Sequence, residues 1–264
     1  MTCIFCGRTG KMSKEHLWPE WVRRTLKDDE MRRRIPHSIG HHDERPPKEW
    51  SAPAFTATIK GVCVPCNTGW MAQIEGIVKE FAEPLVKGEP RFLSKEAQMF
   101  ISAWSYMKIL VLERVDRGRR ILPKDRYQRV FNAAQVGGMT VPSTATVFIA
   151  AHVGGLAGQY QHRGLAPRGH GASRPDLFVG TFTLRHLVVQ VIDNLENDGP
   201  RLPGEREPEV DGRDRSIWPP TRRNLRLLPP ARGLRWPSSA PLSDDELTIF
   251  AGPLPDDYVA SAGF

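Results

Sequence analysis

The stretch that decides the fold runs from Cys3-Ile4-Phe5-Cys6 to Cys63-Val64-Pro65-Cys66 and holds all 4 cysteines of the 264-residue chain. Each pair has a two-residue spacer that presents two thiolates to one point, and together the pairs supply the four corners of a tetrahedral Zn²⁺ site. Gly7 follows the first pair and allows the positive φ of such a tight turn. Two disulfides are one alternative, which a reducing compartment disfavours, and a redox pair is another, which does not explain two copies. We therefore predict one structural zinc ion, bound by Cys3, Cys6, Cys63 and Cys66.

The composition is that of a folded protein with an excess of positive charge. Lys and Arg number 37 against 30 Asp and Glu, and 40% of the residues are hydrophobic. A wholly disordered chain is thereby excluded, and the charge of +7 favours a polyanionic partner. The richest apolar run, residues 107 to 112, is far shorter than the roughly 20 residues of a membrane helix, and the first residues do not resemble an export leader. We expect a cytoplasmic protein with no membrane partner.

Two groups of residues beside the cysteines suggest catalysis. Glu15 and His16 follow the first pair, and Asn67 comes directly after the second. Because Mg²⁺ prefers oxygen ligands and keeps several waters, one carboxylate and one amide oxygen suffice when a phosphate supplies the rest. An imidazole takes a proton from water near neutral pH. The residues therefore predict that Glu15 and Asn67 hold Mg²⁺ or Mn²⁺ and that His16 is the general base of phosphodiester hydrolysis.

A non-catalytic interpretation stays open for the same residues. A Glu-His pair is common on protein surfaces, and an asparagine after a cysteine can simply cap the helix that follows. The chain would then be a zinc-binding module that recognises nucleic acid or a protein partner and cuts nothing.

The order of these motifs resembles a known family. A C-x-x-C pair, an acid followed by histidine, a second C-x-x-C pair followed by asparagine, and then an apolar pattern of helical spacing are similar to the HNH or ββα-metal (His-Me finger) endonucleases. The resemblance is greatest to their zinc-bound branch, the phage endonuclease VII type, and covers about residues 3 to 83. Residues 58 to 62 lack the asparagine that braces the histidine loop in many members, so that brace is absent or supplied elsewhere. The stretch between His16 and Cys63 is longer than in the compact motif, and we expect it to carry an insertion.

The resemblance implies a function and a role for each residue. It implies a DNA endonuclease in which Glu15 and Asn67 bind the divalent ion, His16 activates water, and the cysteines hold a structural zinc. It allows a homodimer, and phage, mobile-element and defence settings all fit such a nuclease. Glu75, two helical turns after Asn67, is a secondary candidate ligand.

Basic residues cluster in residues 17 to 35, where apolar spacings of three to five predict one amphipathic helix with a basic flank. Beside a phosphodiesterase site these arginines are candidates for sequence-independent contacts with the DNA backbone, and their alternative is a solvated face. The candidates are Arg23, Arg24, Arg32, Arg33 and Arg34.

The whole chain is predicted to be α+β, with a zinc-bound ββα-metal finger in residues 1 to 88 and a larger α+β domain of unknown role in residues 89 to 264. Ser94 is expected to cap the most apolar helix, and Ser243 and Glu246 have the spacing of a capping box. We expect a strand within residues 54 to 64, helices in residues 68 to 86 and 124 to 134, two or three strands in residues 145 to 153 and 177 to 192, and no regular structure in residues 37 to 53, 154 to 175 and 196 to 241.

Overall fold

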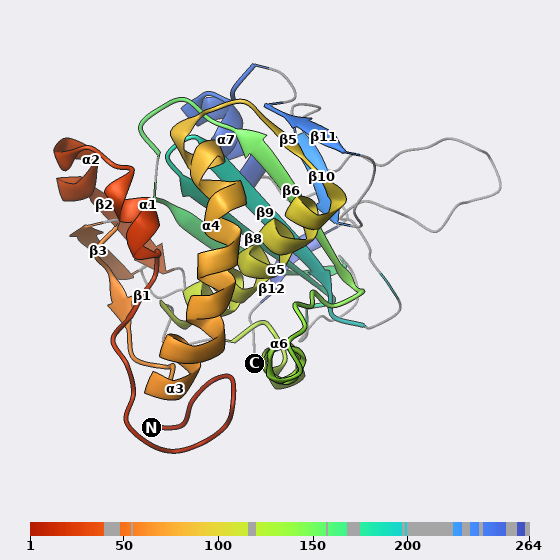
Figure 1. Ribbon diagram of the computed structural model, residues 1–264. Helices are drawn as coiled ribbons and strands as arrows, with labels where there is room; N and C mark the ends of the chain where they lie inside the picture. The colour runs from red at the N-terminus through yellow and green to blue at the C-terminus, as the bar shows by residue number, and fades with distance from the viewer. Residues whose placement is uncertain are drawn as a thin grey trace.

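The computed structural model describes residues 1–39, 48–53, 55–115, 120–156, 158–167, 175–196, 199, 224–228, 233–237, 240–251 and 258–261 (Figure 1). Within these residues, none of the helices combines the length and the apolar character needed to cross a bilayer.

A six-stranded antiparallel sheet forms the centre of the structure (Figure 1). Its strands lie in the order β10 (Asn224–Leu228), β6 (Ala145–Ala151), β9 (Leu187–Asn194), β8 (Leu177–Leu184), β7 (Tyr160–Pro167) and β12 (Tyr258–Ser261). Every residue of β6, β8 and β9 is buried. Because every residue of these three strands is buried, both faces of this part of the sheet are covered.

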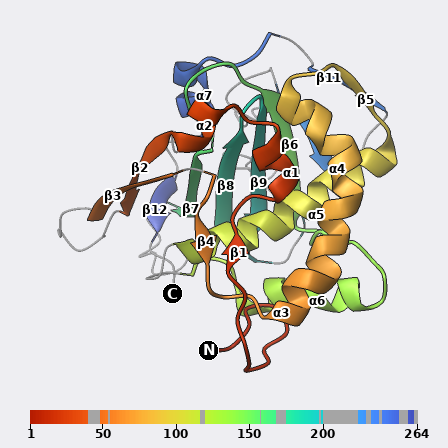
Figure 2. The same ribbon diagram turned by 60° about the vertical axis from the view of Figure 1, so that its left-hand side comes forward.

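Helices provide that cover. On one face lies α5 (Lys95–Leu112), with α4 (Ala72–Lys87) packed against it (Figures 1 and 2). On the other face, Leu247 and Phe250 of α7 (Asp244–Ala251) join a second apolar cluster with residues of β6, β8 and β9. The chain is therefore α+β, as its sequence predicts.

The predicted helix caps are confirmed. The Ser94 hydroxyl accepts a hydrogen bond from the Ala97 N–H at 3.1 Å, at the start of α5. At the start of α7, the Glu246 N–H donates to Ser243 Oγ at 3.3 Å and the Ser243 N–H donates to Glu246 Oε2 at 2.9 Å, so the capping box is reciprocal. The helix predicted at residues 124 to 134 is α6 (Lys124–Gln135).

In the first part of the chain, two short strands that are far apart in the sequence pair with each other. Strand β1 (Glu15–His16) pairs antiparallel with β4 (Thr58–Ile59), and a helical segment follows as α3 (Val64–Cys66), η1 (Asn67–Met71) and α4 (Figure 2). Between β1 and β4 the chain inserts α1 (Glu20–Arg24), α2 (Asp28–Arg32) and the antiparallel pair β2 (Arg34–Ile39) and β3 (Lys48–Pro53). These elements occupy the stretch in which the family resemblance predicts an insertion.

Aromatic contacts join this first part to the rest of the protein. The ring centroids of Trp18 and Phe182 lie 5.4 Å apart, and those of Trp21 and Trp104 lie 5.8 Å apart. One continuous apolar core contains residues from the first cysteine turn, α1, α4, α5 and the central sheet.

Other expectations about local structure were wrong. Residues 17 to 35 contain two short helices instead of one. Helix α1 begins after Pro19 and ends at Arg24, and α2 is a separate helix. Strands β2 and β3 occupy much of the segment expected to be a loop. Strand β7 lies in the predicted linker, and β10 and β11 (Leu234–Trp236), which pairs with β5 (Arg91–Leu93), lie in a segment expected to lack regular structure. These strands have weak local patterns, and pairing with other strands fixes them.

Candidate functional site

The four cysteines converge on one point. Their Sγ atoms all lie within 4.8 Å of one another, and those of Cys6 and Cys63 are 3.6 Å apart. Sulfurs at the corners of a tetrahedron around an ion at about 2.3 Å are separated by roughly 3.8 Å. All four thiols are free of disulfides. The cluster is thus positioned to hold a metal ion, as predicted from the spacing.

Local backbone geometry builds the cysteine cluster. Gly7 has the predicted positive φ, +70°, which closes the first turn. The Cys63 N–H donates to Cys3 Sγ at 3.4 Å, so the second turn is hydrogen-bonded to the first. Burial raises the pKa of Cys3, but N–H groups of Cys63, Cys6 and Phe5 outweigh it and lower the pKa to about 7. Cys3 is therefore readily available as a thiolate, the form that binds metal.

Glu15 is buried and faces a lysine that the sequence analysis did not single out. Lys108 Nζ lies 3.3 Å from Glu15 Oε1 and 2.6 Å from Glu75 Oε1, so one ammonium group bridges two carboxylates. Burial raises the pKa of Glu15 above its ordinary value, with the Lys108 charge opposing it and the Glu75 charge adding to it. Burial lowers the pKa of Lys108, but Glu75 and Glu15 outweigh it and raise the pKa, so the ammonium group stays charged. Glu75, the secondary candidate ligand, therefore lies near Glu15, on the other side of the Lys108 ammonium group.

His16 is exposed, whereas Glu15 beside it on β1 is buried, as expected for neighbouring residues of a strand. Partial burial lowers the pKa of His16, and the positive charges of Arg23 and Lys108 lower it further against the opposing effect of two carboxylates. At neutral pH the imidazole is therefore uncharged, which is the form that accepts a proton.

Asn67 is half-buried and begins η1 (Asn67–Met71), a helical segment that is kinked at Gly69, where φ is −94° and ψ is −113°. Its N–H donates to the Cys63 carbonyl at 3.0 Å, which fixes it beside the last cysteine. The N-cap positions of α3, η1 and α4 are Cys63, Cys66 and Met71, and none has a side-chain cap among the described residues, so the helix-capping alternative for Asn67 is wrong. Across the residues that the structure describes, the side chains of Asn67 and His16 form no hydrogen bond.

The five candidate arginines have different surroundings. Arg24 pairs with Glu20 at 2.7 Å, Arg33 donates to the Gly155 carbonyl at 2.5 Å, and Arg34 donates to the backbone and hydroxyl of Ser51. Arg32 is exposed.

Arg23 differs from the other four. It is half-buried, and its Nε is buried without a hydrogen-bond partner in the described part of the chain. Its charge also acts on His16. Of the five, Arg23 is therefore the cation that combines nearness to His16 with an unsatisfied donor.

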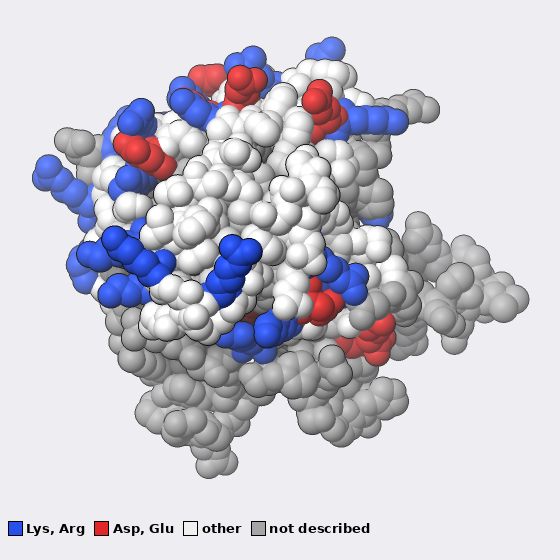
Figure 3. Space-filling model, turned by 60° about the horizontal axis from the view of Figure 1, so that its bottom comes forward, with Lys and Arg blue, Asp and Glu red and all other residues white. Residues whose placement is uncertain are grey.

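On the face in Figure 3, Lys and Arg side chains form separate groups among uncharged residues and some acids, and they do not join into one stripe.

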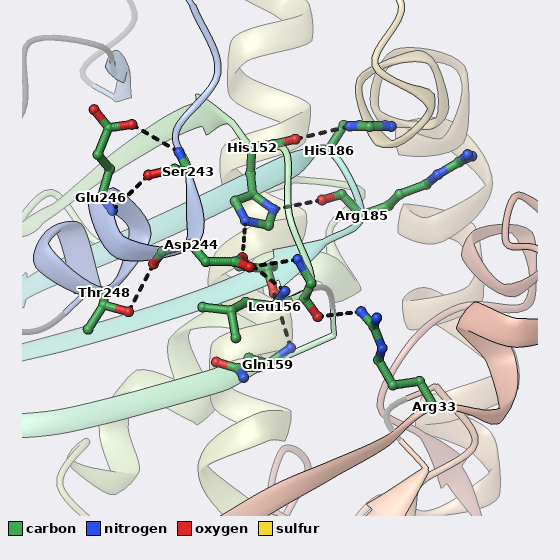
Figure 4. Close-up of polar contacts among 12 residues, drawn as sticks. Arg33, His152, Leu156, Gln159, Arg185, His186, Ser243, Asp244, Glu246 and Thr248 are labelled. Carbon is green, nitrogen blue, oxygen red and sulfur yellow. Dashed lines mark hydrogen bonds and ion pairs between the residues drawn. The ribbon is translucent and has the colours of Figure 1, made fainter.

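A second polar cluster joins α7 to the sheet (Figure 4). His152 Nε2 lies 2.9 Å from Asp244 Oδ1, and His152 Nδ1 lies 3.2 Å from the Arg185 carbonyl. The Asp244 carboxylate also accepts the N–H groups of Gly155 and Leu156 at 2.8 and 3.1 Å. Because the His152 side chain is fully buried, this cluster is structural.

No family model, curated protein or solved structure matches the chain.

Proposed function

We propose that this chain is a zinc-stabilised, Mg²⁺- or Mn²⁺-dependent endonuclease that hydrolyses phosphodiester bonds in DNA. The observation that carries the proposal is the order of elements around the cysteine cluster. Glu15 and His16 lie on β1, β1 pairs with β4, and the second cysteine pair leads into a helical segment that begins with Asn67. This order of strand, strand and helix, with the acid and the histidine on the first strand and the amide after the last cysteine, supports the proposal.

Zinc is the proposed occupant of the cysteine cluster. Four thiolates in a tetrahedral set select zinc or an iron-sulfur centre, and separated C-x-x-C turns are typical of structural zinc. The hydrogen bond from the Cys63 N–H to Cys3 Sγ satisfies a sulfur lone pair, as second-shell donors do in metal sites. Zinc would hold the first and second turns together and thereby keep β1 near the start of the helical segment.

His16 is the proposed general base. Its neutral imidazole takes a proton from water, and the water oxygen forms a new bond to phosphorus as the bond to the 3′ oxygen breaks in line. The products are a 5′-phosphate and a 3′-hydroxyl, which the family resemblance also implies. A divalent ion bound by Glu15 and Asn67 would stabilise the negative charge on the leaving oxygen.

Plasmid cleavage tests the proposal. Purified protein with supercoiled plasmid and Mg²⁺ or Mn²⁺ is expected to give nicked and linear DNA, with no cleavage in EDTA. His16→Ala is expected to abolish cleavage and to keep its zinc content and melting temperature. Cleavage by His16→Ala at the wild-type rate would overturn the assignment of the base.

A specific observation favours a second candidate function. Lys108 already provides Glu15 with a positive charge, so the carboxylate is satisfied without a divalent ion. The alternative is therefore a non-catalytic zinc module that binds nucleic acid or a protein partner. Binding of a DNA duplex that is unaffected by Mg²⁺, Mn²⁺ and EDTA, with no cleavage at any metal concentration, would support this alternative.

A further inference from the structure

Lys108 is a fully buried charge in the most apolar helix of the chain. Its neighbours on α5 are Met107, Ile109 and Leu110, and the exposed fraction of its side chain is 0%. Lysine is almost never found in such a place without a partner. Replacing a buried ion pair by apolar residues of similar size is often neutral or stabilising, so packing alone does not account for this lysine.

The contacts of Lys108 indicate what it does. Its Nζ contacts Glu15 on β1 and Glu75 on α4, and α5 itself lies outside the segment that resembles the HNH family. Two carboxylates that face each other repel, and burial disfavours their charged forms. One ammonium group between them offsets both effects. The contact with Glu15 is through Oε1.

We propose that Lys108 is a positioning residue, whose ammonium group holds the Glu15 carboxylate by Oε1 and leaves Oε2 available to a divalent ion. This role rests on the proposed function, because it requires Glu15 to be a metal ligand. Lys108 touches the Glu15 carboxylate and not the ion, and through this contact α5 supports β1. Removal of such outer-shell partners typically weakens metal binding by about 10–100-fold.

A charge-balanced double variant separates positioning from charge compensation. Lys108→Met alone leaves the buried Glu15 and the half-buried Glu75 without the ammonium group that lies between them, and it therefore risks misfolding. The double variant Lys108→Met with Glu75→Gln removes one positive and one negative charge, so the formal charge of the cluster stays the same. A matched control is Lys79→Met with Glu83→Gln, which removes a partly exposed pair separated by 3.8 Å on α4, together with the contact of Glu83 with Lys87.

The measurement is Mn²⁺ affinity, from the electron paramagnetic resonance signal of free Mn²⁺, together with zinc content and melting temperature. We expect the Lys108/Glu75 variant to bind Mn²⁺ about 10–100-fold more weakly than the wild type, with zinc retained. The control pair is expected to bind as the wild type does. Mn²⁺ affinity of the Lys108/Glu75 variant within twofold of the wild type would overturn the positioning role.

Two single variants complete the test. Glu15→Gln is expected to lose the same Mn²⁺ site, and Glu75→Gln, which keeps Lys108 on Glu15, is expected to weaken binding less than the double variant. A loss in Glu75→Gln as large as that in Glu15→Gln would make Glu75 a ligand in its own right and overturn the proposal.

The failure of the proposed function gives a different result. Wild-type protein that binds Mn²⁺ through Glu15 but cleaves no DNA would refute the nuclease function and leave the positioning role intact. Wild-type protein without Glu15-dependent Mn²⁺ binding would overturn both.

Discussion

His152 and Asp244, 92 positions apart in the chain, form a partly buried contact of 2.9 Å between Nε2 and Oδ1. The other ring nitrogen of His152 faces the Arg185 carbonyl at 3.2 Å. Both ring nitrogens of His152 thus lie within hydrogen-bond distance of an oxygen atom. This contact holds the start of α7 against β6.

Removing the Asp244 carboxylate should weaken the fold at neutral pH. Asp244→Ala leaves His152 and the Gly155 N–H without an acceptor, and we expect a loss of about 1–3 kcal/mol in the free energy of unfolding. Urea denaturation at pH 7 measures it. Asp245→Ala, at the next and exposed position of α7, is the control and should change stability by less than about 0.5 kcal/mol.

The same carboxylate should contribute to acid sensitivity. Burial raises the pKa of Asp244, but hydrogen bonds from Gly155, His152 and Leu156 outweigh it and hold the pKa below the ordinary value of 3.8. A lowered pKa in the folded state means that this stability is present above pH 3.8 and is lost as pH falls through the folded pKa. Asp244→Asn should therefore lose less stability than the wild type between pH 4 and pH 2, as urea midpoints would show. An equal loss in both proteins would contradict the assignment.

Gly154 is required by the close approach of Asp244. A Cβ atom at Gly154 would lie 2.2 Å from Asp244 Oδ1. Gly154→Ala should therefore displace the carboxylate and cost about 1–3 kcal/mol, and the cost should shrink in an Asp244→Ala background. Gly76→Ala on α4, where a Cβ meets nothing within 4 Å, should instead be neutral or stabilising by up to about 1 kcal/mol. Additive effects of Gly154→Ala and Asp244→Ala would exclude the steric explanation.

Loss of the cysteine cluster should destabilise the first part of the chain. Cys63→Ser is expected to lose bound zinc and to lower the melting temperature, because a structural metal contributes folding free energy. Elemental analysis measures the bound zinc and calorimetry the melting temperature of Cys63→Ser and, as the control, of His16→Ala. Only Cys63→Ser should lose zinc. Co²⁺ in place of zinc should give the strong visible bands of a tetrahedral thiolate site, and octahedral Co²⁺ bands would refute the four-thiolate assignment.

Arg23 and Arg24 should differ in their effect on DNA. Arg23 has an unsatisfied donor near His16, whereas Arg24 pairs with Glu20 in solvent. Arg23→Gln is expected to weaken DNA binding and to reduce the slope of log affinity against log salt by about 1, which is the effect of losing one phosphate contact. Arg24→Gln, one position along the same helix, serves as the control. Equal losses in the two variants would indicate a general charge effect instead of a specific contact.

The pH profile of cleavage should move with Arg23. Burial is the largest cause of the lowered pKa of His16, and the Arg23 charge is the next. A general base works when deprotonated, so the acid limb of the profile should lie below the ordinary histidine value of 6.5. Arg23→Gln should raise the pKa of His16 and shift that limb to higher pH. A shift in the opposite direction in kcat/KM against pH would exclude His16 as the titrating base.

Features encoded by residues close in sequence could be predicted. The spacing of the cysteines identified the metal cluster, and Ser94 and the Ser243 capping box identified helix starts, because caps and C-x-x-C turns are local. The buried strands β6, β8 and β9 were recognisable as apolar runs rich in Val, Ile and Phe.

Features that depend on distant partners could not be predicted. Lys108 has no motif around it, and only the fold brings it to Glu15 and Glu75. His152 and Asp244 meet across 92 positions. Strand β7 contains Gly164 and several polar residues, and hydrogen bonding to β8 and β12 defines it. A charged residue inside an otherwise apolar helix was the one signal that would have identified Lys108.

The aromatic pairs Trp18 with Phe182 and Trp21 with Trp104 limit which fragments of the protein can be expressed in a folded form. A fragment that stops at residue 88 would carry the indoles of Trp18 and Trp21 without the rings of Phe182 and Trp104 that contact them. Such a fragment would expose an apolar surface to solvent and is expected to self-associate on expression, even with zinc supplied in the medium. Recombinant protein for experiments on the cysteine cluster should therefore include Trp104 and Phe182.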